Sequence, residues 1–267
     1  MSGSLDGTVK LWNYSDSLQL KATSKSQKFG VTSVVALSDG SSCAASYQNG
    51  TIRFFENENL NEIGSINLGV MEAWTLALSP DDGAIASGNQ NGDINIWSMQ
   101  DSHEKVATLE TNNKMVLSVS FSKDALLASA SMDGFLNVFD VATQTIVHKV
   151  EAHSLPIRSI AFSPDGRLLY SASDDRHVSV YDTLSGTAVN RFSHRGMALS
   201  VAASPDHRHF VVGGSDSSVY LWDLGMQKQV QLYEQHNGQV WGVSYAQRRE
   251  KSLVASVGDD ALLQVYG

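Results

Sequence analysis

The stretch ALSPDDGAIASGNQNGDINIW, residues 77–97, contains two turn signals and two strand signals in close succession. Pro80-Asp81-Asp82-Gly83 has the composition of a turn, and the apolar run AIASG after it is typical of a strand buried on both faces. Asn91-Gly92 is a hairpin signal, and DINIW then alternates polar and apolar side chains, as a half-buried strand does. The stretch therefore predicts an antiparallel hairpin whose last strand ends on Trp97.

The same pattern occurs seven times along the 267 residues. An Asp or Asn marks each turn, with successive turns spaced 43, 42, 42, 42, 41 and 44 residues apart: Asp6, Asn49, Asn91, Asp133, Asp175, Asp216 and Asp260. An aromatic residue follows each of them by six positions: Trp12, Phe55, Trp97, Phe139, Tyr181, Trp222 and Tyr266. A period of about 42 residues with this signature indicates the blades of a β-propeller.

These turns and aromatic residues resemble the WD-repeat family, whose members are β-propellers of four-stranded blades. The resemblance implies an all-β, seven-bladed propeller in which residues 1–267 form a single domain, with a partial repeat at 1–28 and then six repeats of about 42 residues. The first blade is incomplete, and we expect about 40 residues of a full ring to be missing at the N-terminus through truncation. The alternative is an open ring with unpaired strand edges.

In the WD-repeat family a His, a Ser or Thr, the turn Asp and the third-strand aromatic residue form a structural hydrogen-bond network. Three repeats carry a His at the matching position, and the other repeats lack it. The matching sets are His153, Ser171, Asp175 and Tyr181; His236, Ser256, Asp260 and Tyr266; and His194, Asp216 and Trp222, with Val212 in place of the hydroxyl. A nucleophilic triad would occur once, whereas this set recurs at the repeat period, so we interpret it as structural.

Composition argues against several other classes of function. The net charge of −9 is unsuited to a non-specific grip on nucleic acid, and no apolar run is long enough for a membrane span. No metal, phosphate or dinucleotide motif is present, and a metal on His207 and His209 is less favoured than a solvated turn. The sequence predicts no enzyme, no cofactor, no metal and no small-molecule substrate.

Two tryptophans, Trp74 and Trp241, lie outside the aromatic positions of the repeat. Aligned on the first strand of each repeat, they fall in one column with Thr32, Leu117, Arg158 and Leu199. In the WD-repeat family this column borders the top face, as do the residue two positions earlier and the residue before the turn Asp. The resulting candidate partner-binding residues are Trp74, Trp241, Leu117, Leu199, Arg158, Met115, Met197, Glu72, Asp174 and Asp259.

Tryptophan and methionine at an exposed rim favour binding of a partner protein over simple filling of the channel mouth. The acidic residues Glu72, Asp174 and Asp259 suggest a partner peptide that carries an arginine. Arg158 could instead take a carboxylate, and the sequence leaves both readings open.

Four segments, residues 72–81, 155–169, 209–223 and 239–260, are similar to the WD-repeat subunits of the superkiller (Ski) complex. This resemblance implies a scaffold, cytoplasmic and nuclear, that binds a tetratricopeptide subunit and an RNA helicase and so supports 3′-to-5′ RNA decay by the exosome. It also implies binding to subunits of the Paf complex in transcription, without direct contact to nucleic acid or membrane. The alternative is a substrate receptor of a ubiquitin ligase.

Overall fold

The computed structural model describes residues 1–15, 17–100, 103–248 and 251–267. These residues form β-strands joined by turns, and none of them lies in a helix. The chain divides into two compact units, Met1–Val119 (unit 1) and Ser120–Gly267 (unit 2), which are described separately below.

Unit 1 contains three antiparallel sheets. Their strand orders are β1-β2-β3, β4-β5-β6-β7 and β8-β9-β10-β11, and β1 has only two residues. The strands are β1 Ser2–Gly3, β2 Val9–Tyr14, β3 Leu18–Thr23, β4 Val31–Ala36, β5 Ser42–Tyr47, β6 Thr51–Glu56, β7 Glu62–Asn67, β8 Thr75–Leu78, β9 Ala84–Gly88, β10 Asp93–Ser98 and β11 Lys105–Glu110.

Unit 2 contains the remaining four sheets, and the first strand of the first of them begins in unit 1. The sheet orders are β12-β13-β14-β15, β16-β17-β18-β19, β20-β21-β22-β23 and β24-β25-β26. The strands are β12 Val116–Phe121, β13 Leu126–Ser131, β14 Phe135–Asp140, β15 Thr145–Glu151, β16 Ile157–Phe162, β17 Leu168–Ser173, β18 His177–Asp182, β19 Ala188–Ser193, β20 Ala198–Ala203, β21 His209–Gly214, β22 Val219–Asp223, β23 Lys228–Tyr233, β24 Val240–Arg248, β25 Lys251–Gly258 and β26 Leu263–Tyr266.

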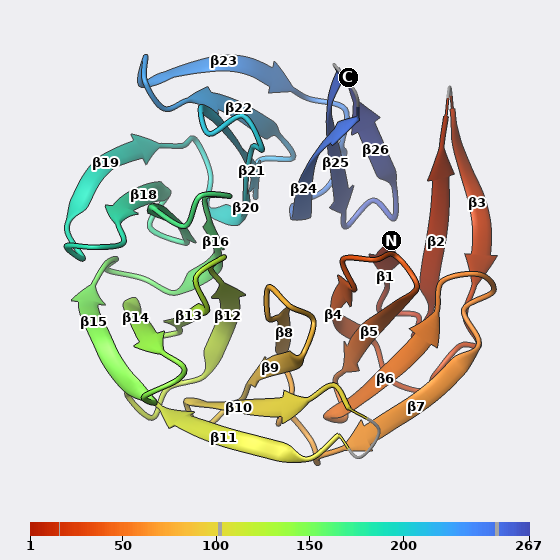
Figure 1. Ribbon diagram of the computed structural model, residues 1–267. Helices are drawn as coiled ribbons and strands as arrows, with labels where there is room; N and C mark the ends of the chain where they lie inside the picture. The colour runs from red at the N-terminus through yellow and green to blue at the C-terminus, as the bar shows by residue number, and fades with distance from the viewer. Residues whose placement is uncertain (16, 101–102, 249–250) are drawn as a thin grey trace. The chain divides into compact units, whose positions relative to one another are not determined.

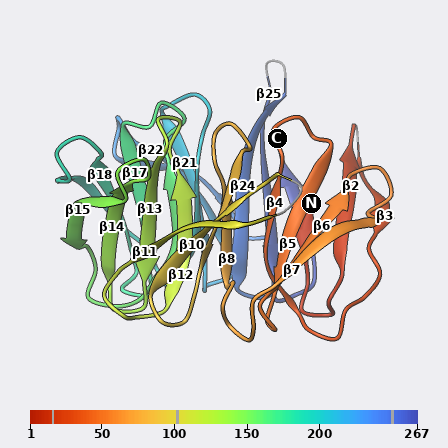
Figure 2. The ribbon, with the colours of Figure 1, turned by 60° about the horizontal axis from the view of Figure 1, so that its bottom comes forward.

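Neighbouring sheets of unit 2 meet through their first strands. Strand β20 contacts β16 on one side and β24 on the other, while β19 and β23 lie at the opposite edges of their sheets (Figure 1). A second view shows β13 and β14 standing side by side within their sheet (Figure 2). A hydrogen bond from the Val201 N–H to Ser159 Oγ, 3.2 Å long, joins β20 to β16 across the gap between sheets.

The turn between the second and third strands has the same construction in most sheets. The side-chain oxygen of the turn Asp or Asn accepts a hydrogen bond from the backbone N–H two residues later at Asp6, Asn49, Asp133, Asp175 and Asp260. The next residue adopts a positive φ in all seven turns: Gly7, Gly50, Gly92, Gly134, Arg176, Ser217 and Ala261. This Asx turn is the reason for the Asp or Asn that the sequence repeats.

The third-strand aromatic residue coincides with an irregularity in the sheet. In six sheets the register between the third and fourth strands shifts immediately before that residue, for example between Val180 and Tyr181. The ring then packs against the neighbouring sheet, as Tyr181 does in the buried cluster that contains Leu136 and Val138 of β14. The outer bulge and the aromatic residue therefore act together at the junction of two sheets.

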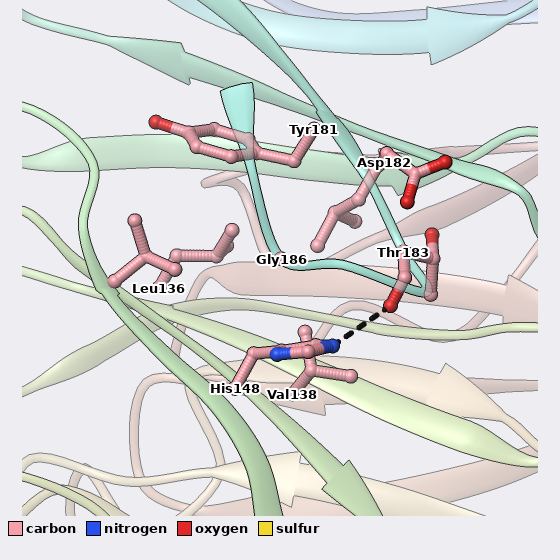
Figure 3. A pocket seen from close by; sticks show the side chains of 9 residues that line it. Leu136, Val138, His148, Tyr181, Asp182, Thr183 and Gly186 are labelled. Carbon is pink, nitrogen blue, oxygen red and sulfur yellow. Dashed lines mark hydrogen bonds between the residues drawn. The ribbon is translucent and has the colours of Figure 1, made fainter. Parts of the chain in front are cut away.

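A small apolar pocket marks the same junction between β14–β15 and β17–β18 (Figure 3). Its volume of about 10 Å³ is room for one water molecule at most. His148 of β15 closes the pocket, and its Nε2–H donates to the carbonyl oxygens of Thr183 at 3.0 Å and Leu184 at 3.1 Å. The imidazole fits only because Gly186 has no side chain, since a Cβ there would lie 2.6 Å from His148 Nδ1.

Substitution of Gly186 by Ala is expected to lower the free energy of unfolding by about 2 kcal/mol. Gly186 has φ +69°, which an L-residue adopts with strain, and the new methyl group would displace the imidazole. Urea unfolding of Gly186→Ala in the wild-type and His148→Ala backgrounds checks this. If the substitution costs as much without His148 as with it, the proposed collision is wrong.

Candidate partner-binding site

A bulge in the inner strand pair sets the direction of the column residues. In unit 2 the register between the first and second strands omits one residue in three sheets, and the omitted residues are Arg158, Leu199 and Trp241. In unit 1 the same shift omits Thr32. A bulged residue is not paired in the ladder, so its side chain can be turned toward the strand end. Four residues of the column found in the sequence are therefore bulges, whereas Trp74 precedes β8, whose pairing with β9 is regular.

Trp241 is the most exposed tryptophan whose position the repeat does not explain. Its residue exposure is 49%, and its indole Nε1–H donates to Asp259 Oδ1 at 2.6 Å. Asp259 is the residue before the turn Asp of the same sheet, so both ends of the contact are fixed by the repeat. One hydrogen bond thus holds a large apolar ring at the surface in a single orientation.

Arg158 makes the corresponding contact in the β16–β19 sheet. Its Nε donates to Asp174 Oδ1 at 2.9 Å and its Nη2 donates to Asp174 Oδ2 at 2.6 Å. The carboxylates of Asp174 and Asp259 are therefore engaged within the chain. The expectation of pairing with an arginine of a partner does not fit Asp174, whose two oxygens both hold Arg158, whereas for the exposed Asp259 it stays a prediction.

In unit 1, Trp74 lies immediately before β8 and is partly exposed, with its backbone N–H bonded to the Gly88 carbonyl at 2.9 Å. Glu72 and Met115 are also partly exposed, and the Glu72 carboxylate accepts a hydrogen bond from Asn89 Nδ2 at 3.0 Å. This third carboxylate of the predicted set is thus partnered as well.

Two of the predicted binding residues are not at the surface. Leu117 is 9% exposed and Leu199 is 3% exposed, because an apolar side chain at this position turns into the core where arginine and tryptophan turn outward. Met197 in unit 2 is partly exposed. The accessible members are therefore Trp241, Arg158, Met197, Asp259 and, only slightly, Asp174 in unit 2, and Trp74, Glu72 and Met115 in unit 1.

The predicted histidine networks form in two sheets. His153 contacts Asp175 Oδ2 through Nδ1 at 2.9 Å and Ser171 Oγ through Nε2 at 2.7 Å. Tyr181 does not join this set, because its hydroxyl donates to the carbonyl oxygen of Ala152 at 3.2 Å. Burial lowers the pKa of His153, so the neutral ring donates from Nδ1 and accepts the serine proton at Nε2.

The network around His236 is complete, although the sequence indicates that no repeat carries the family's full set. Nδ1 lies 2.9 Å from Asp260 Oδ2, and Nε2 lies 2.7 Å from Ser256 Oγ. Ser256 Oγ lies 3.2 Å from the Tyr266 hydroxyl, so a tyrosine extends the network where the family has tryptophan.

The third set, around His194, stays unconnected. Neither ring nitrogen of His194 has a partner among the described residues, and Trp222 Nε1 has none either. Val212 stands where other sheets have serine, such as Ser87, which accepts from Trp97 Nε1 at 3.1 Å. Asp216 instead accepts the Tyr220 hydroxyl proton. Burial lowers the pKa of His194 to about 4.

Burial excludes the nucleophile reading of the two connected sets. Ser171 is 0% exposed and Ser256 is 1% exposed, so a substrate could not reach either hydroxyl. Within the described residues, no group of three His, Cys, Asp or Glu side chains is placed to hold a metal ion. A further finding on the same residues is that no helix has the length and hydropathy needed to cross a bilayer.

The repeated sheets, their Asx turns and the His–Ser–Asp sets define a WD-repeat β-propeller, which confirms the predicted seven-bladed all-β fold class. A family model described as the IFT122 first beta-propeller matches residues 1–267, and the chain belongs to this family of WD-repeat propellers.

Two of the curated relatives below carry WD repeats in their names. WD repeat-containing protein SL1-17 of Schistosoma mansoni is 32% identical over 271 residues, covering 100% of this chain and 88% of that protein. WD repeat-containing protein VIP3 of Arabidopsis thaliana is 34% identical over 187 residues, covering 64% of this chain and 58% of that protein. Meiotic recombination protein rec14 of Schizosaccharomyces pombe is 31% identical over 135 residues, covering 50% of this chain and 44% of that protein. The matches to VIP3 and rec14 thus span less than two thirds of those proteins.

Sequence reasoning found the column but missed the contacts inside it. Arg158 and Asp174 are 16 residues apart, and Trp241 and Asp259 are 18 apart. Both pairs join the bulge residue to the residue before the turn Asp of the same sheet. The alignment contained the signal, because each sheet supplies one residue to each of these two positions. An arginine with an aspartate there, as in Arg158 and Asp174, indicates a contact.

Substitution of Ser171 by Ala is expected to destabilise the protein by about 1–3 kcal/mol, because His153 Nε2 loses its buried partner. Ser129, at the same strand position of the preceding sheet, is equally buried but has no hydrogen-bond partner. Ser129→Ala should therefore lower the free energy of unfolding by less than Ser171→Ala does. Urea unfolding of both variants checks this, and equal losses would contradict the assigned role of the network.

Stability should fall as the pH is lowered from about 6.5 to about 4. His194 stays neutral in the folded protein while it takes up a proton in the unfolded chain, so the unfolded state binds more protons in this window. This lowering of the His194 pKa corresponds to a loss on the order of 3 kcal/mol in the free energy of unfolding, and the loss is complete below pH 4. His194→Phe keeps the ring contacts with Tyr220 and Trp222 but cannot titrate.

Urea unfolding of both proteins across this pH range is the measurement. The other titrating groups are common to both proteins, so the difference between the two pH profiles isolates His194. If the free energies of unfolding of the two proteins change with pH in parallel, His194 does not contribute to the pH dependence of stability.

Proposed function

We propose that the chain is a non-catalytic scaffold that binds partner proteins through the exposed residues at the start of its inner strands. The observation that carries the proposal is Trp241, which is 49% exposed and yet hydrogen-bonded to Asp259 at 2.6 Å. Trp74 holds the corresponding position in unit 1.

A fixed aromatic ring is a favourable binding element. Tryptophan contributes a large apolar contact area, and the indole that is already oriented by Asp259 loses little conformational freedom when a partner covers it. Such rings are enriched among the residues that contribute most to the affinity of protein interfaces. The absence of an accessible nucleophile in the histidine sets supports the scaffold class over an enzyme.

The finer proposal is a role like that of WD repeat-containing protein 61, the WD-repeat subunit of the Ski complex. It rests on the similarity of residues 72–81, 155–169, 209–223 and 239–260. The partners would be a tetratricopeptide subunit and an RNA helicase in exosome-dependent RNA decay, and Paf-complex subunits in transcription. The protein would then be present in cytoplasm and nucleus, with RNA handled by its partners.

Combined substitution of Trp74 and Trp241 by Ala is expected to weaken partner binding, with a loss of roughly 2 kcal/mol or 30-fold for a central aromatic residue. The measurement is affinity purification from native lysate with mass spectrometry, followed by titration of the recovered tetratricopeptide protein. Circular dichroism and thermal melting must first show that the variant is folded.

Trp222→Ala is the matched control, because this ring packs on Phe192, His194 and Phe210. Because the ring is only partly buried, its loss should lower stability by about 2–3 kcal/mol and leave the affinity of the remaining folded protein unchanged. Equal recovery of partners by wild type and the Trp74/Trp241 variant would place the binding site elsewhere. Recovery of ubiquitin-ligase subunits in place of the expected partners would refute the Ski and Paf assignment.

A further inference from the structure

Four of the nine arginines of the chain surround a single turn, residues 173–176 between β17 and β18. Arg158 and Arg191 reach it through their bonds to Asp174 and Asp175. Arg176 is part of the turn, and Arg195 adjoins it because the N–H of the preceding His194 donates to the Arg176 carbonyl at 2.8 Å. We name Arg158, Arg176, Arg191 and Arg195 the arginine rim.

The carboxylates at this turn are covered, whereas the guanidinium groups face solvent. The side chains of Asp174 and Asp175 are 10% and 5% exposed, and those of Arg191 and Arg195 are 53% and 74% exposed. Asp174 is held by Arg158, and Asp175 is shared by His153 and Arg191. The rim therefore presents positive charge on a chain whose net charge is −9.

The two remaining arginines are weakly paired. Arg195 lies 3.9 Å from Glu234, and both side chains are mostly exposed, so this contact contributes little. Arg176 is exposed and has no ion-pair partner among the residues that the structure describes. Arg176 and Arg195 thus each offer planar N–H donors that match the two oxygens of a carboxylate.

An open hollow of about 500 Å³ begins beside the rim. It lies between the ends of β15 and β19 and is lined by Val150, Glu151, Val189 and Arg191, among others. Strands β15 and β19 are the outer strands of their sheets, and an extended chain can pair with such an edge. Glu151 also lines the hollow and places one negative charge in it.

We infer that the arginine rim binds an acidic segment of a partner protein, with Asp or Glu side chains on Arg176 and Arg195 and the backbone continuing into the hollow at Arg191. Arg158 belongs both to this rim and to the candidate partner-binding residues, whereas Trp241 lies on β24 of another sheet. Nucleic acid fits it less well, because the exposed Phe and Trp side chains among the described residues are Phe29 and Trp241, which belong to other sheets, so no ring is available for base stacking.

The test is fluorescence anisotropy with the purified chain and a short labelled poly-glutamate peptide, at low and at physiological ionic strength. We expect saturable binding that weakens with salt, and about a tenfold loss for the Arg176→Gln/Arg195→Gln variant. Glu151→Gln should bind the peptide at least as tightly as the wild type, because it removes a like charge.

Arg167→Gln is the matched control. Arg167 is exposed like the rim residues, but it precedes β17 whereas the turn follows it, roughly 20 Å away along the strand. An unchanged affinity for this variant supports a specific rim. No binding at low ionic strength, an equal loss with Arg167→Gln, or tighter binding of poly-uridine RNA or of a phosphoserine peptide than of poly-glutamate would overturn the inference.

Discussion

The Asx turn between the second and third strands is the constraint on which the rest of each sheet depends. The side-chain oxygen of a short residue accepts a hydrogen bond from the N–H of the residue two positions later, and the residue between them adopts a left-handed backbone conformation. This geometry fixes the register of the hairpin and therefore places the aromatic residue six positions later. In the β16–β19 and β24–β26 sheets the same carboxylate also holds a buried histidine. The second ring nitrogen of that histidine contacts a serine of the strand before the turn, Ser171 or Ser256.

Two kinds of irregularity convert this regular frame into a surface. The outer bulge precedes the aromatic residue that packs between sheets, as at Tyr181. The inner bulge leaves one residue out of the ladder, and the polarity of its side chain then decides its direction. Leu199 turns into the core, whereas Arg158 and Trp241 turn to the surface, where Asp174 and Asp259 hold them. The fold provides the position, and the side chain determines whether the position becomes core or surface.

The frame could be predicted from the sequence because its signals are local. Asn91-Gly92 and Trp97 lie within a few residues of one another, and β9 and β10 form where the turn and alternation indicated them. The site was only partly predictable, because its contacts join residues 16 to 18 apart whose meeting depends on the bulge in the register. The arginine rim was missed for the same reason: Arg195 follows His194, whose N–H donates to the Arg176 carbonyl at the end of the β18–β19 pair, and no spacing rule indicates this contact.

The inner bulge also has an evolutionary consequence. Because Thr32, Arg158, Leu199 and Trp241 are left out of the ladder, each can change without altering the pairing of its neighbours. A lineage of such proteins can therefore acquire a new partner by exchanging single residues at these positions, while the turns and histidine networks remain under separate selection for folding. Duplication of the repeat multiplies these independent positions, so one ancestral sheet can give rise to many recognition surfaces.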